Sequence, residues 1–161
     1  NLYLENGYEQ KDLQVLAPMY DGSIGIYALN DLLQDIFNPK SLDKKEHQIG
    51  RFTYRVGDKI LQLKNQPDDD VYNGDIGILI DITKEDNKSK TYLIVDFDGT
   101  IVKYDSNTFT NITLGYCISV HKAQGSEYNV VIMPVSHEYG IMVRRKFFSK
   151  QSSLQTLKRS A

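Results

Sequence analysis

The middle of this 161-residue chain is a series of short strand-like segments, and that series constrains the fold more than any other feature. Between Phe52 and Thr110, residues that favour strands gather in four segments: 59–63, 76–82, 91–97 and 100–104. Clusters of turn-forming residues separate them. Asp98 and Gly99 mark the tightest turn, since glycine adopts the positive φ that a two-residue hairpin requires. Four or five strands so close together predict a small antiparallel barrel of the SH3-like or OB-like kind.

The segments on either side of this stretch have a different pattern, typical of an α/β layer. Residues 13–17 form a short apolar run, and five apolar residues then recur at helical spacing: Ile26, Leu29, Leu32, Leu33 and Ile36. We predict a strand, a loop and a helix, with Ser23 as the N-cap and Asn38-Pro39 as the end. Residues 130–135 form another strand-like run. The first and last strands are therefore expected in one sheet, with the barrel inserted between them.

This pattern predicts an α/β fold with an inserted small antiparallel β-barrel of the SH3-like or OB-like kind. Residues 1–51 and 112–148 are expected to form two parts of one α/β domain, and residues 52–111 the inserted barrel. Residues 149–161 form a divergent basic tail that we expect to be disordered. Within the first part, residues 40–51 are polar and charged, which predicts a connector.

The composition argues against several classes of protein. Apolar residues make up 40% of the chain and charged residues 25%, which indicates a folded protein. No run of about 18 apolar residues is present, so we expect no membrane contact and a cytoplasmic location. The net charge of −2 argues against a wholly basic nucleic-acid-binding surface, while it allows a local basic groove.

Metal and thiol chemistry have little support in the sequence. Cys117 lies in an apolar run, which favours a buried thiol. His47 and His137 have no companions at metal-ligand spacing. The adjacent carboxylates 68–70 follow a proline in a loop typical of a solvated turn. No metal site is predicted.

A polar cluster separates two apolar runs in the last third of the chain. The stretch 114–135 reads LGYCISVHKAQGSEYNVVIMPV, with a hydroxyl at Ser119, an imidazole at His121 and an ammonium at Lys122. Polar groups at the end of a strand are placed to bind ligands. These side chains can donate to phosphate oxygens, and Gly125 permits close approach of a backbone. An ordinary solvated loop explains the same residues equally well on chemistry alone.

The segment SVHKAQGSE, residues 119–127, resembles motif V of RecD-like superfamily 1 DNA helicases, in which a threonine or serine precedes HK-x-QGSE. Residues 14–30 are similar to the motif IV region of that family, and residues 52–77 to the start of its inserted SH3-like barrel. By this resemblance the flanking parts form a partial RecA-like motor domain. It also implies two sets of site residues: Ser119, His121 and Lys122 contact the DNA backbone, and Gln124, Gly125 and Glu127 approach the nucleotide.

The resemblance implies a fragment of an ATP-dependent 5′-to-3′ DNA helicase that is inactive alone. ATP and Mg²⁺ are then cofactors of the full-length parent, and none is expected for the fragment. The chain has no G-x-x-x-x-G-K-[ST] phosphate loop, so we do not expect it to hydrolyse ATP. Expected partners are single-stranded DNA and the missing first motor lobe, and no oligomeric state is predicted. The arginine-bearing motif VI is expected after Tyr139, where residues 142–151 diverge from the family pattern.

Two other interpretations of the sequence remain open. Residues 92–102, YLIVDFDGTIV, match the first motif of haloacid-dehalogenase-like phosphatases, with Asp96 as nucleophile and Asp98 as its acid or base. Only 61 residues follow Thr100, too few for the rest of that fold, so a hairpin explains the motif better. The other interpretation is a non-catalytic nucleic-acid-binding or peptide-binding barrel. Its candidates for stacking on bases are Tyr54, Tyr72, Tyr92 and Tyr104.

Overall fold

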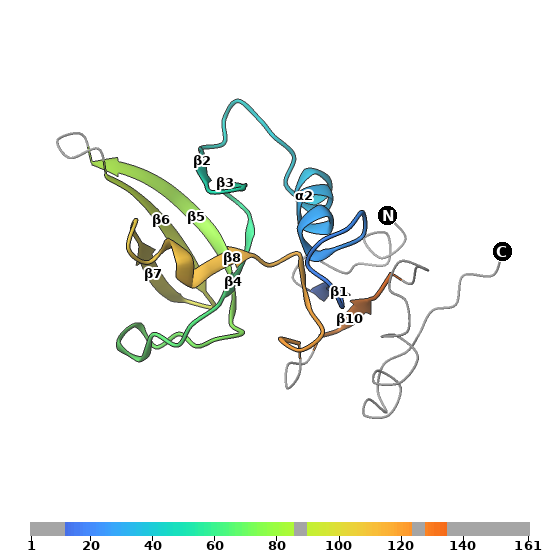
Figure 1. Ribbon diagram of the computed structural model, residues 1–161. Helices are drawn as coiled ribbons and strands as arrows, with labels where there is room; N and C mark the ends of the chain where they lie inside the picture. Colours follow the sequence, from blue (N-terminus) through green and yellow to red (C-terminus); the bar gives the residue numbers. More distant parts are fainter. Residues whose placement is uncertain (1–11, 86–89, 124–127, 135–161) are drawn as a thin grey trace.

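A parallel sheet of three strands joins segments that lie far apart in the sequence. The computed structural model describes residues 12–85, 90–123 and 128–134. Strand β1 (Leu13–Ala17) is central, between β9 (Cys117–Ser119) and β10 (Val130–Ile132). Figure 1 labels β1 and β10 next to each other. Both neighbours run parallel to β1. The prediction that the first and last strands share a sheet is therefore confirmed.

Helix α2 (Ile26–Phe37) packs on this sheet and is tied to its edge by one side chain. Ile26 lies in an apolar cluster with β1 and Cys117. Nδ2 of Asn30 donates to the carbonyl oxygen of Cys117 at 2.8 Å, and Oδ1 of Asn30 accepts from the Cys117 N–H at 3.0 Å. The buried amide thus pairs with backbone groups of β9, which is an edge strand of this sheet among the described residues.

The helix begins at a different cap from the one predicted and ends where predicted. Gly25 is the N-cap residue in place of Ser23, and no side chain caps the first turn. A Cβ atom on Gly25 would lie 2.4 Å from the carbonyl oxygen of Asp21, so only glycine fits this tight loop. Asn38 is the C-cap, as the following proline predicts. In the described part of the chain, no helix is long and apolar enough to cross a membrane.

The middle of the chain forms an antiparallel sheet of five strands in the order β7-β6-β5-β4-β8. The strands are β4 (Lys59–Gln62), β5 (Ile76–Glu85), β6 (Lys90–Phe97), β7 (Thr100–Tyr104) and β8 (Ile112–Leu114). Short 3-10 turns, η2 (Pro67–Asp69) and η3 (Phe109–Asn111), precede β5 and β8. Asp98 and Gly99 have φ values of 51° and 99°, as the predicted hairpin requires.

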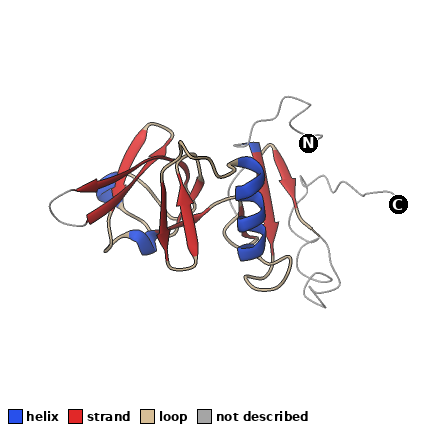
Figure 2. Ribbon diagram, turned by 90° about the horizontal axis from the view of Figure 1, so that it is seen from above, coloured by secondary structure: helices blue, strands red, loops and turns tan. Residues whose placement is uncertain are grey.

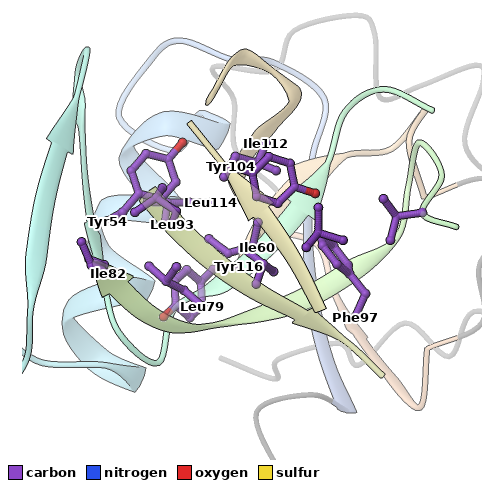
Figure 3. Packing of buried hydrophobic residues seen from close by; sticks show 13 residues of the cluster. Tyr54, Ile60, Leu79, Ile82, Leu93, Phe97, Tyr104, Ile112, Leu114 and Tyr116 are labelled. Atoms are coloured by element: carbon purple, nitrogen blue, oxygen red, sulfur yellow. The ribbon is translucent and has the colours of Figure 1, made fainter. Parts of the chain in front are cut away.

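A separate hairpin, β2 (Glu46–Ile49) and β3 (Phe52–Arg55), packs against the five-stranded sheet and encloses the main core with it. Buried residues of this core include Tyr54, Ile60, Leu79, Leu93, Tyr104 and Leu114 (Figure 3). Leu33 of α2 contacts this core and also the apolar cluster of the parallel sheet. The helix therefore joins the two halves of the molecule (Figure 2). Within the described residues the five-stranded sheet is open, with β7 and β8 at its edges, and a closed barrel is not observed.

The connector predicted for residues 40–51 is wrong in part, because it contains strand β2. The strand was not predicted because its residues are polar. Polar pairs across the hairpin stabilise it, since Nε of Arg55 donates to Oε1 of Glu46 at 2.5 Å. The boundary expected between residues 51 and 52 falls in the turn of this hairpin. A division there would separate two paired strands.

The apolar run 114–120 also differs from its expected form, because it enters two different sheets. Leu114 ends β8 in the five-stranded sheet, and Cys117 begins β9 in the parallel sheet. Gly115 lies at the crossing, where a Cβ atom would come within 3.0 Å of the Ile60 carbonyl carbon. The chain passes from one sheet to the other in two residues.

Candidate nucleic-acid-binding edge

The loops that follow β1 and β9 leave the parallel sheet at the same edge. Ala17 is paired with Ser119, and these are the last residues of their strands. The loop 18–25 and the turn 120–123 therefore begin side by side. In open α/β sheets, ligands bind at the carboxyl ends of the strands, where loops present polar groups. This edge, here called the carboxyl edge, is the candidate site.

Ser119 shapes the turn that carries the predicted DNA contacts. Its carbonyl oxygen accepts from the N–H groups of Lys122 at 3.0 Å and Ala123 at 3.2 Å, and its Oγ accepts from the Lys122 N–H at 3.3 Å. Ser119 is buried and His121 is exposed. His121 and Lys122 are thus the more accessible of the three predicted DNA contacts. The predicted nucleotide contacts lie outside the described residues: Gln124, Gly125 and Glu127.

Lys122 connects the carboxyl edge to the loop that precedes β5. Its Nζ donates to Oδ1 of Asn73 at 2.8 Å. The Asn73 N–H in turn donates to Oδ1 of Asn65 at 2.8 Å, and Gly74 beside it has a φ of 107°. An ammonium has three donors, so it can bind a phosphate as well as Asn73. The geometry therefore places a partly exposed cation where the two halves of the molecule meet.

A buried carboxylate that the sequence analysis missed holds α2 and β3 together. Asp58 accepts hydrogen bonds from the Arg55 N–H at 2.7 Å, Gln34 Nε2 at 2.6 Å, Asn38 Nδ2 at 2.7 Å and the Tyr116 hydroxyl at 3.0 Å. Burial raises the pKa of the Asp58 carboxyl above its ordinary value, although these donors oppose the shift. Glycine followed by aspartate predicts a turn at this point in the sequence, but it gives no sign of partners 24 and 58 residues away.

Two further buried side chains, also missed in the sequence, bond the halves directly. Lys59 on β4 is 2% exposed, and its Nζ donates to the carbonyl oxygen of Leu13 at 2.8 Å. Desolvation lowers the pKa of the Lys59 ammonium to about 8. Gln14 on β1 donates through Nε2 to the carbonyl oxygens of Gly115 at 3.2 Å and Tyr116 at 3.1 Å. These bonds fix β1, and with it the carboxyl edge, against the five-stranded sheet.

The phosphatase interpretation is not favoured by the geometry around Asp96. Oδ1 of Asp96 accepts from the Gly99 N–H at 2.6 Å, which closes the turn between β6 and β7. A phosphatase of that class needs a helix after the strand that carries its nucleophile, whereas β6 pairs with β7 as an antiparallel hairpin. Asp96 and Asp98 therefore shape a turn.

The four tyrosines considered for stacking divide into two pairs. Tyr54 and Tyr104 are 3% and 0% exposed and belong to the main core, so their predicted stacking role is wrong. Tyr104 and Val102 alternate with the exposed residues of β7, which is the usual pattern of core residues in a strand. Tyr72 is 46% exposed, and the Tyr92 ring is covered by the Lys103 ammonium at 3.7 Å. Stacking of nucleic-acid bases on Tyr54 and Tyr104 is therefore ruled out.

Two family models match the chain. The model of the ATP-dependent RecD-like DNA helicase SH3 domain matches residues 29–97, and that of the UvrD-like helicase C-terminal domain matches residues 114–148. The ATP-dependent RecD2 DNA helicase of Deinococcus radiodurans is 36% identical over 126 residues, which cover 78% of this chain and 16% of that protein. The RecBCD enzyme subunit RecD of Buchnera aphidicola subsp. Schizaphis graminum is 28% identical over 122 residues, which cover 74% and 19%. The chain spans less than a fifth of either relative.

Solved structures of Pif1 helicases share the fold. A structure of two coordinating Pif1 helicases at forked double-stranded DNA has a TM-score of 0.51 and 19% identity, and the match covers 81% of this chain and 34% of that one. Pif1 helicase from Bacteroides in complex with ADP-AlF3 and single-stranded DNA also has a TM-score of 0.51, with 18% identity and coverage of 81% and 36%. At this identity the likeness shows a common fold alone.

Proposed function

Because this chain belongs to the RecD-like superfamily 1 DNA helicases, we propose that it supplies the DNA-gripping edge of a second motor lobe. The pairing of Ala17 with Ser119 carries this proposal, since Ser119, the first residue of the motif V segment, lies at the carboxyl edge beside the loop after β1. Lys122 and exposed His121 then meet the phosphates of a single strand there. Ser119 holds the turn from which both project.

In this proposal an SH3-like unit is inserted into a RecA-like domain, with boundaries that differ slightly from those expected. The unit runs from β2 to β8, because β2 pairs with β3 and β8 pairs with β4. Strand β9 follows β8 after two residues and belongs to the parallel sheet. The two parts of the RecA-like domain therefore lie before residue 46 and after residue 114. The RecD-like SH3 model matches residues 29–97, from within α2 to the end of β6, which supports the SH3-like unit and leaves its boundaries to the strand pairing.

The parent protein, in this proposal, is an ATP-dependent 5′-to-3′ helicase whose first motor lobe lies outside this chain. Bound ATP with Mg²⁺ supplies the energy for lobe closure in such an enzyme. Gln124, Gly125 and Glu127 are the residues of this chain proposed to approach the nucleotide. No phosphate loop occurs in the sequence, so we do not expect this chain to hydrolyse ATP.

In this proposal, the hydrogen bond of Lys122 couples movement within the motor domain to the strength of DNA binding. Its Nζ is bonded to Asn73, which belongs to the loop before β5. A displacement of that loop relative to Lys122 breaks this bond and frees a third ammonium donor for DNA phosphates. The two arrangements bind DNA with different strength, which is what coupling of lobe position to grip requires.

Replacing Lys122 with alanine should weaken binding of single-stranded DNA and flatten its dependence on salt. One neutralised phosphate contributes about 0.7 to the slope of log affinity against log salt, so the slope should fall by about that amount. The loss should be equal for different base sequences, since phosphate contacts read no bases. Titration of labelled oligonucleotides at several salt concentrations measures both effects.

Lys84→Ala is the matched control, because Lys84 is an exposed lysine on β5, outside the carboxyl edge. Its removal should leave the slope unchanged. Circular dichroism establishes that both variants keep the fold. Equal affinity and equal slope in Lys122→Ala and the unmodified chain would contradict the proposed role of Lys122.

A further inference from the structure

Three aromatic rings and one guanidinium form a partly exposed cluster beside the carboxyl edge. Tyr20 follows β1, Tyr27 lies in the first turn of α2, and Arg51 and Phe52 lie at the tip of the β2–β3 hairpin. The Tyr27 ring centroid is 5.5 Å from that of Tyr20 and 5.7 Å from that of Phe52. The Arg51 guanidinium carbon lies 4.0 Å from the Tyr27 centroid. These four residues are called the aromatic cluster below.

Backbone hydrogen bonds hold the aromatic cluster in place. The N–H of Tyr27 donates to the carbonyl oxygen of Tyr20 at 3.1 Å, and the N–H of Ile26 donates to that of Met19 at 2.9 Å. The loop after β1 is thus fixed to the first turn of α2. Tyr20 is nevertheless 47% exposed. A ring already held in place loses little conformational entropy when a planar ligand stacks on it.

The chemistry of the cluster fits a nucleobase and its phosphate. Bases of any kind stack on aromatic rings, and arginine beside such a ring binds phosphate. Tyr27 is covered by Arg51, so the exposed ring that remains for a base is Tyr20. Asp21 next to it is exposed and repels phosphate. The backbone of a bound strand therefore passes on the side of Arg51.

We propose that Tyr20 is a base-stacking subsite for single-stranded DNA, with Arg51 as its phosphate contact. This inference rests on the proposed function, which brings the strand to the carboxyl edge. The subsite extends the contact beyond motif V, because the loop that carries Tyr20 begins beside Ser119. It adds a contact to the bases, whereas Lys122 contacts the backbone alone.

A comparison of two probes isolates stacking from phosphate binding. One probe is a labelled oligothymidylate, and the other is an abasic strand of the same length and charge. Tyr20→Ala should weaken binding of the oligothymidylate about 5-fold or more, the effect of losing one stacked base. Binding of the abasic strand and the salt slope should not change. Tyr20→Phe keeps the ring and should bind both probes as the unmodified chain does.

Arg51→Ala should act on both probes, since it removes a phosphate contact, and should lower the salt slope by about 0.7. Tyr92→Ala is the matched control, because Tyr92 is another partly exposed tyrosine but lies on β6 of the five-stranded sheet. It should change neither binding nor slope. Tyr20→Ala and Tyr92→Ala are compared at equal circular dichroism, so that loss of fold is not mistaken for loss of stacking.

The outcomes separate this inference from the proposed function. If Tyr20→Ala binds oligothymidylate normally, or weakens both probes equally, the stacking subsite is wrong. A base-dependent loss in Tyr20→Ala together with an unchanged Lys122→Ala supports the subsite and contradicts the role of motif V. Failure of the unmodified chain to bind either probe overturns both.

Discussion

Replacing Asp58 with alanine should lower the free energy of unfolding by about 3–5 kcal/mol, a large part of the stability of an ordinary domain. Asp58 is fully buried, and the variant leaves the side-chain donors of Gln34, Asn38 and Tyr116 without their acceptor. Each buried donor left unpaired costs about 1–3 kcal/mol. Because the three donors come from α2 and from the segment before β9, both halves of the molecule should be affected.

Asp58→Asn tests whether the acceptor or the shape of the side chain matters. In this variant an NH2 group replaces one carboxylate oxygen, so a donor faces groups that are themselves donors. Asn38 cannot turn its own amide to compensate, because its Oδ1 accepts from Lys44. We expect an intermediate loss of about 1–3 kcal/mol, measured by urea denaturation.

Asp43→Ala is the control for both variants, since Asp43 is exposed, and its loss should stay within about 0.5 kcal/mol. If Asp58→Ala were no less stable than Asp43→Ala, the network around Asp58 would not contribute to folding.

Between pH 8 and pH 10.5 the unmodified chain should gain about 3 kcal/mol of stability relative to Lys59→Met. The pKa of Lys59 is lowered from 10.5 to about 8 in the folded state by desolvation. In this pH range the unfolded chain therefore binds more protons than the folded chain, and stability rises with pH. The expected gain follows from about 1.4 kcal/mol for each pKa unit.

The measurement is the difference between the two proteins at each pH, because other groups also titrate. Burial raises the pKa of the Cys117 thiol and of the Tyr54 hydroxyl to about 12, and both groups lower stability as the pH rises above their ordinary values. Their effects are common to both proteins and cancel in the difference. Lys84→Met serves as a control at an exposed lysine. Parallel curves for Lys59→Met and the unmodified chain would show that Lys59 has no lowered pKa.

Local patterns in the sequence predict the regular elements well. Strands 13–17 and 100–104 have the predicted bounds, because turn-forming residues flank each apolar run. The end of α2 is also predicted, since Pro39 restricts the residue before it. Pairing of the first and last strands follows from the α/β pattern on both sides of the insert. For the strand bounds and the end of α2, neighbours in the sequence decide the conformation.

Contacts between distant residues have no such signal. Nothing near Asp58 or Lys59 in the sequence indicates that either is buried, because their partners lie in other elements. The polar strand β2 was missed for the same reason, since pairing with β3 rather than an apolar alternation defines it. Tyr20 and Arg51 are brought together only by the packing of the β2–β3 hairpin on α2. The residues of the candidate site are therefore brought together by contacts between distant segments. The bounds of the strands depend mainly on local sequence.

The central position of β1 has a consequence for the order of folding during synthesis. Leu16 is paired with Ile118, a residue made about a hundred positions later. At about 5–20 residues per second, β1 waits roughly 5–20 seconds on the ribosome before its partner exists. Its apolar side chains are open to aggregation during this time.

Folding of the inserted strands reduces the distance between β1 and the segment that becomes β9, although it does not shorten the time before β9 is made. Hairpins such as β6–β7 form from neighbouring segments, and pairing of Ile60 with Leu114 then brings the chain back beside β4. Strand β9 follows within a few residues, so closing the parallel sheet costs little further loop entropy. We infer that the insert folds first and acts as a template for the sheet. Pulsed hydrogen exchange during refolding tests this order, which would be wrong if amides of β1 and β9 became protected before those of β6 and β7.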